Sequence, residues 1–103
     1  MFVKIYEYHI KRDMEVFYLE IQEKATRIYN KYLSCDVMYL KSIDDETLWL
    51  EITRYRSEEE YLNNIQKVNS EPVMKELFEQ FYSCLVPEKQ SILERNFFAK
   101  LKI

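Results

Sequence analysis

Glycine is absent from this chain of 103 residues, although globular proteins usually contain about 7% glycine. Loops that hold phosphate groups need glycine, because only a residue without a Cβ atom lets the backbone approach the ligand closely. The absence therefore excludes a P-loop and a glycine-rich dinucleotide-binding loop. Tight turns must use Asp, Asn and Ser instead.

Sequence features typical of membrane, secreted, nucleic-acid-binding or metal-binding proteins are absent as well. The chain has no apolar run long enough to span a membrane, no signal peptide, and no basic stripe of the kind that binds nucleic acid. Its two cysteines, Cys35 and Cys84, are not spaced like metal ligands. We therefore expect a cytoplasmic protein with reduced thiols, without a metal site, and without nucleic acid or membrane as a partner.

Aromatic and aliphatic residues are plentiful. Hydrophobic residues make up 48% of the chain and aromatic residues 16%, including nine tyrosines and six phenylalanines. That content supports a real core and excludes a disordered chain. The length predicts a single domain over residues 1–103.

Residues 48–61 change from a strand pattern to a helix start, and the rest of the prediction is built around them. Ser57, followed by Glu60, forms a capping box that predicts a helix beginning there. The preceding strand alternates between two faces, one aliphatic (Leu48, Leu50, Ile52) and one aromatic and polar (Trp49, Glu51, Thr53, Tyr55). We expect the aliphatic face to pack beneath helices and the other to line a pocket or a subunit interface.

Hydrophobic patterns along the whole chain predict the order strand, helix, strand, strand, helix, strand. Strands are predicted over 2–10, 36–43, 47–56 and 91–103, and helices over 13–33, 57–68 and 72–85, with Asp13 capping the first helix. This order predicts an α+β, ferredoxin-like βαββαβ sandwich, in which two helices, the second interrupted before Pro72, cover one face of a four-stranded antiparallel sheet. The uncovered face, predicted to contain Trp49 and Tyr55, is too apolar for water, so we expect a homodimer.

Two segments give the chain a family resemblance: Trp49-Leu50-Glu51-Ile52-Thr53-Arg54-Tyr55 followed by Ser57-Glu58-Glu59-Glu60-Tyr61, and the break at Ser70-Glu71-Pro72-Val73. Over nearly its whole length the chain resembles the dimeric α+β barrel superfamily, in particular the antibiotic biosynthesis monooxygenase-like domains. The resemblance implies a small pocket between sheet and helices in each subunit of a dimeric barrel. It also implies, for an enzyme, a cofactor-independent monooxygenase, an isomerase or a decarboxylase acting on a small flat organic substrate.

The chain departs from this family at one position. Many members carry a histidine about seven residues after the serine that ends the strand, and counting from Ser57 reaches Asn64. Haem-degrading members use a helix histidine as the iron ligand, whereas this chain has no histidine after His9. An amide is a poor ligand for haem iron, so the departure argues against a haem-degrading role.

Two residues are candidates for proton transfer. His9 is the only histidine, the side chain most often used for proton transfer, and the alternative is a partly exposed residue at a strand end. Glu51 could be a pocket base whose pKa is raised by burial, or it could pair with a cationic side chain on a neighbouring strand.

The resemblance further implies that Tyr6, Tyr8, Trp49 and Tyr55 shape a substrate pocket and that Asn64 orients the substrate. Trp49 could instead fill the dimer interface. The competing function is therefore a homodimer that binds a small molecule without turnover, or one that is purely structural.

Overall fold

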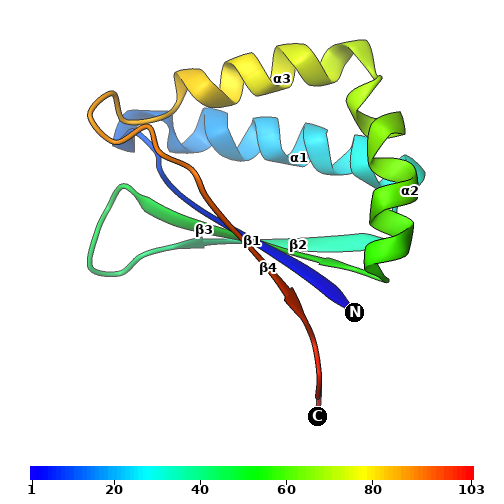
Figure 1. Cartoon of the computed structure of the whole chain (residues 1–103). Coiled ribbons are helices and arrows are strands. Elements are labelled where there is room, and N and C mark those ends of the chain that lie inside the picture. Colours follow the sequence, from blue (N-terminus) through cyan, green and yellow to red (C-terminus); the bar gives the residue numbers. More distant parts are fainter.

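Four strands and three α-helices form two layers, with all the helices on one side of the sheet (Figure 1). The structure is a computed structural model that describes residues 1–103. Its elements are β1 (Phe2–His9), a 3₁₀ turn (Arg12–Met14), α1 (Glu15–Tyr32), β2 (Cys35–Lys41), β3 (Leu48–Tyr55), α2 (Glu58–Asn69), α3 (Pro72–Ser83) and β4 (Leu93–Phe98).

The sheet has the order β2-β3-β1-β4, and every neighbouring pair is antiparallel. The two central strands are paired so that Ile5 lies opposite Ile52. This is the predicted ferredoxin-like α+β fold. The main differences in bounds are that β2 begins and ends earlier than expected, and that β4 is shorter and stops before the last five residues.

The start of α2 follows the prediction, whereas the start of α1 does not. The hydroxyl of Ser57 accepts a hydrogen bond from the amide of Glu60 at 3.0 Å, as a helix cap does. Asp13 caps no helix, because it lies inside the 3₁₀ turn, where the backbone carbonyl of Lys11 accepts from the amide of Met14. The prediction of an Asp13 cap was therefore wrong.

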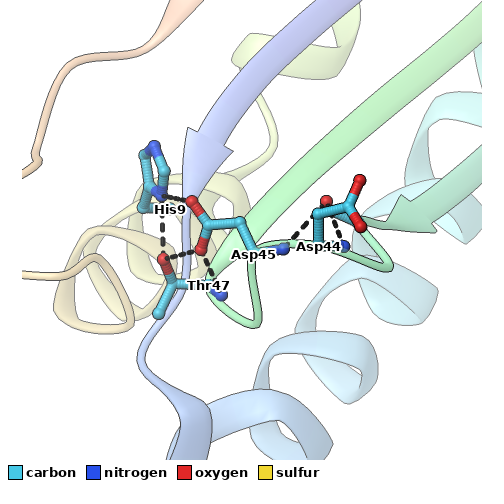
Figure 2. A network of polar contacts seen from close by, with 5 residues as sticks. His9, Asp44, Asp45 and Thr47 are labelled. Atoms are coloured by element: carbon cyan, nitrogen blue, oxygen red, sulfur yellow. Dashed lines mark hydrogen bonds and ion pairs between the residues drawn. The ribbon is translucent and has the colours of Figure 1, made fainter.

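The β2–β3 hairpin turns without glycine and without any residue at positive φ (Figure 2). The hydroxyl of Ser42 accepts hydrogen bonds from the amides of Asp44 and Asp45, each at 3.1 Å. The carboxylate of Asp45 accepts from both the amide and the hydroxyl of Thr47. These side chains replace the conformational freedom that glycine would supply.

The two faces of β3 point the opposite way from the prediction. Trp49, Thr53 and Tyr55 are at most 5% exposed and lie beneath the helices, where the Trp49 ring is 5.0 Å from that of Tyr18 on α1. The aliphatic face is the uncovered one. Alternation separates two faces but does not say which is covered when both are apolar; here the larger rings fill the deeper space under the helices.

The uncovered face of the sheet is mainly apolar, and it also contains the charged side chains of Glu7, Arg54 and Arg95. Apolar side chains of all four strands contribute to it: Val3, Ile5, Met38, Leu40, Leu48, Leu50, Ile52, Leu93 and Phe97. Four of them are between 41% and 47% exposed. The apolar character that suggested a partner is therefore present, although Trp49 and Tyr55 are not part of it.

Both cysteines are free, and Cys84 is fully buried. None of the helices is both long enough and apolar enough to cross a lipid bilayer.

Candidate active site

A cavity of about 480 Å³ lies between the sheet and the helices. Its wall draws on every strand and every α-helix, and it is mainly hydrophobic. Of the nine tyrosines in the chain, seven line it: Tyr6, Tyr8, Tyr29, Tyr39, Tyr55, Tyr61 and Tyr82. The volume is within the range of sites that hold small organic molecules.

The mouth of the cavity lies between α3 and β4. Among the lining residues, Phe78 and Tyr82 on α3 and Glu94 on β4 are exposed to solvent, as is Asn69 at the end of α2. The residues on the central strands are half-buried or buried. A ligand would therefore enter past the edge strand β4 and reach the central strands at the floor.

Glu51 is the polar centre of that floor. Its Oε1 atom accepts a hydrogen bond from the hydroxyl of Tyr8 at 2.8 Å, and the Tyr8 and Tyr18 hydroxyls are 2.6 Å apart. Because Tyr8 donates its proton to Glu51, Tyr18 must donate to Tyr8. The second carboxylate oxygen, Oε2, has no partner within the chain and is not sealed off from the cavity.

No cation balances the charge of Glu51, whose carboxylate forms no salt bridge. Burial raises its pKa from 4.5 to about 7, and only the hydrogen bond from Tyr8 acts in the opposite direction. At neutral pH the carboxyl group therefore exists in both protonation states, the condition in which an acid–base group works best.

Four further hydroxyls face the cavity without a hydrogen-bond partner in the chain, those of Tyr6, Tyr29, Tyr55 and Tyr61. Burial is the largest cause raising the pKa of each. They therefore stay neutral at physiological pH and can donate hydrogen bonds to a ligand.

The lining contains two carboxylates, Glu51 and Glu94, and no lysine, arginine or histidine. Glu94 is neutralised by the buried ammonium of Lys4, whose Nζ is 2.8 Å from Glu94 Oε2 and 2.7 Å from Asn96 Oδ1. The hydrogen bond from Lys4 lowers the pKa of Glu94. Glu51 thus carries the only unbalanced charge of the site. No three His, Cys, Asp or Glu side chains lie close enough together to hold a metal ion.

No protein-family model and no curated protein sequence matches this chain. Solved structures do match it. SnoaB, a cofactor-independent oxygenase from Streptomyces nogalater solved as a mutant, has a TM-score of 0.72 at 6% identity, with 99% of this chain and 95% of that chain covered.

Two further structures have a TM-score of 0.73. A proposed antibiotic biosynthesis monooxygenase from Caulobacter crescentus is 7% identical over 95% of this chain and 88% of its own. An uncharacterised NIPSNAP domain protein from Burkholderia xenovorans is 12% identical over 96% and 94%. The chain has the antibiotic biosynthesis monooxygenase-like fold, as the sequence resemblance implied. Identities this low establish the fold alone.

Within this fold, four of the residues singled out from the sequence meet at the cavity: Tyr6, Tyr8, Glu51 and Tyr55. Two others do not reach its lining. The ring of Trp49 packs edge-on against Tyr18 in the core behind the cavity, and Asn64 lies on α2, whose lining residues are Tyr61, Ile65 and Asn69.

His9 also lies outside the cavity, at the end of β1 (Figure 2). Its Nδ1 is 2.8 Å from the hydroxyl oxygen of Thr47 and 3.9 Å from the carboxylate of Asp45. Because the Thr47 hydroxyl donates to Asp45, His9 Nδ1–H donates to Thr47. His9 therefore ties the end of β1 to the β2–β3 turn.

Sequence reasoning missed four tyrosines of the wall, Tyr29, Tyr39, Tyr61 and Tyr82. Tyr39 has the strand parity of Val37, and Tyr29 lies on the apolar stripe of α1. The strand parity of Tyr39 and the helix position of Tyr29 can be read from the sequence. They indicate that these residues line the cavity only when it is known which face of the sheet the helices cover.

The raised pKa of Glu51 predicts a specific dependence of stability on pH. Folded Glu51 titrates near 7 and unfolded glutamate near 4.5, so the folded state binds an additional proton between these values. The free energy of unfolding should therefore fall as pH rises from 5 to 8, by about 3 kcal/mol from this group. Urea unfolding of wild type and Glu51→Gln across this range should show the fall only in the wild type.

Glu94→Gln is the matched control. The pKa of Glu94 is lowered, so that group is ionised in both folded and unfolded chains above pH 6 and its removal should leave the slope of the wild type intact. Equal slopes in wild type and Glu51→Gln would mean that Glu51 is not protonated near neutral pH.

Proposed function

We propose that this chain is a cofactor-independent monooxygenase-like enzyme that acts on a small flat organic substrate bound in the cavity. The observation that carries the proposal is a carboxylate without a cationic partner, Glu51, at the floor of a pocket built from tyrosine rings. Such a group is costly to keep in a purely structural core, and perturbed acids in a cleft are typical of functional sites.

In this proposal Glu51 is the general base. Its free Oε2 atom takes the proton of a substrate hydroxyl, while Tyr8 and Tyr18 hold Oε1 and fix the orientation of the carboxylate. The deprotonated substrate is rich in electrons and reduces molecular oxygen itself. The substrate supplies all four electrons: one oxygen atom becomes a carbonyl oxygen of a quinone-type product, and the other leaves as water with two hydrogen atoms of the substrate, so no separate reductant is needed.

The walls supply position and specificity. Aromatic rings offer flat apolar surface for stacking, and hydroxyls such as those of Tyr29 and Tyr55 can hold a carbonyl or hydroxyl oxygen of the substrate. The sequence offered His9 and Glu51 as proton carriers. The proposal places this role on Glu51, because the imidazole of His9 lies outside the cavity.

Oxygen uptake with a panel of quinols and other hydroxylated aromatic compounds tests this function. We expect turnover with at least one neutral compound, at a rate that rises through pH 7 as Glu51 ionises. Glu51→Gln should lower kcat by about 100-fold or more, the usual contribution of a general base. Glu58→Gln, an exposed change in the first turn of α2, is the control and should keep the rate of the wild type.

A wild-type rate in Glu51→Gln would contradict the assignment of the base. Tight binding without turnover of any compound would favour the competing function, a homodimer that binds a small molecule. We place either function in the cytoplasm, where the two free thiols would stay reduced.

We also propose that two copies of the chain pair through the uncovered faces of their sheets. Rows of apolar side chains cross that face from strand to strand, such as Met38, Ile52 and Ile5. The pair Asp36–Arg54 lies at one end of the face, and a second pair, Glu7–Arg95, lies within it, with Glu7 opposite Leu50 and Leu93. Apolar residues still make up most of the face, as they do in permanent interfaces.

Sedimentation equilibrium at micromolar concentration should therefore give twice the chain mass of 12.7 kDa. Ile52→Lys places a charge in the centre of the interface and should yield a folded monomer. Val16→Lys, on α1 at a side chain that is 71% exposed, should stay dimeric. A wild-type monomer with the same circular dichroism would refute this pairing.

A further inference from the structure

The charge of the cavity restricts what can bind there, an argument that rests on the proposed function of the cavity as a substrate site. Glu51 has no cation among its neighbours, and no lysine, arginine or histidine lines the wall. An anionic ligand would bring a second negative charge next to Glu51 in a poorly solvated space. A cation would instead supply the partner that the chain does not provide.

The aromatic wall is also suited to a positive charge. The faces of aromatic rings carry negative potential and attract ammonium groups within about 6 Å of the ring centre. Beside this cavity the chain already uses that interaction, because Lys4 Nζ lies 5.9 Å from the ring centre of Tyr6 and 5.1 Å from that of Tyr61. Both rings line the cavity.

Lys4 does not fill the role at Glu51. Its ammonium is held by Glu94 and Asn96, and Glu51 has no part in that pair. Several tyrosines lie beside Glu51, among them Tyr8, Tyr29 and Tyr39, whose pKa is raised first by burial and then by the charge of Glu51. They would surround a ligand ammonium placed at Glu51 Oε2 with aromatic carbon and neutral hydroxyls.

We propose that the natural ligand of this cavity is an aromatic compound carrying a protonated amine, which pairs with the carboxylate of Glu51. The ring stacks against the tyrosine wall, and the ammonium donates hydrogen bonds to Oε2. Glu51 therefore selects the charge of the ligand.

Three phenols that differ mainly in their end group test this inference: tyramine is a cation, tyrosol is neutral and 4-hydroxyphenylacetate is an anion. In isothermal titration calorimetry at pH 8, tyramine should bind at least about tenfold more tightly than tyrosol, as a buried ion pair with cation–π contacts allows. The anion should bind more weakly than either. In Glu51→Gln the advantage of tyramine should disappear, whereas Glu58→Gln should keep it.

Proton linkage gives a second readout. At pH 6 Glu51 is mostly protonated, so tyramine binding should release close to one proton, seen as a dependence of the binding enthalpy on the buffer. Its affinity should rise about tenfold between pH 6 and pH 8. Tyrosol should show neither effect.

The outcomes separate this inference from the proposed function. Equal or tighter binding of tyrosol, together with oxygen uptake on neutral phenols, would overturn the cationic ligand and leave the enzyme in place. Tyramine binding with the expected proton release but without oxygen uptake on any amine-bearing phenol would support the cationic ligand and overturn the oxygenase. Failure of all three phenols to bind at millimolar concentration would overturn the cationic ligand.

Discussion

The structure depends on which of the two faces of β3 lies under the helices, because that choice sets the residues of the cavity and of the uncovered surface. β3 lies between β1 and β2, and its side chains alternate, so a shift of one residue would exchange the two faces completely. In the observed register Glu51 points toward the helices, between Trp49 and Thr53. The same alternation leaves the aliphatic side chains on the outer face. One strand therefore supplies both the floor of the cavity and the centre of the apolar surface proposed to pair with a second copy.

Large aromatic rings pack between the helices and the sheet beside Glu51. Tyr8 packs edge to face against both Tyr18 and Phe81, with the centroids of Tyr8 and Phe81 4.9 Å apart. Tyr8 and Phe81 also line the cavity. Tyr8 satisfies one carboxylate oxygen of Glu51, and nothing in the chain satisfies the other. Burial of the carboxylate without a cation is unfavourable, and it is relieved by protonation or by a ligand.

Much of the fold followed from patterns that depend on local chemistry. The Ser57 cap, the break before Pro72 and the stripe of α1 each have one physical interpretation, and the structure contains all three. The fold resemblance was also confirmed, and it rested mainly on the strand-to-helix segment 49–61 and the break at 70–73. The covered face of the sheet could not be predicted in this way, because both faces of β3 are apolar and only tertiary packing chooses between them. Asp13 shows the limit of cap prediction, since it lies inside a 3₁₀ turn that precedes the helix.

The sequence could predict that the candidate site contains an acid among aromatic rings, but it could not predict which residues line the cavity. Glu51 stood out as an acid on an aromatic strand face, and the absence of a nearby cation could be known only from the three-dimensional arrangement. The carboxyl group of Glu51 therefore gives the most direct test. In protein labelled with ¹³C at glutamate side chains, an NMR titration should show one carboxyl resonance with a midpoint near pH 7 that is missing in Glu51→Gln. A midpoint near the ordinary 4.5 for Glu51 would contradict this account of the cavity.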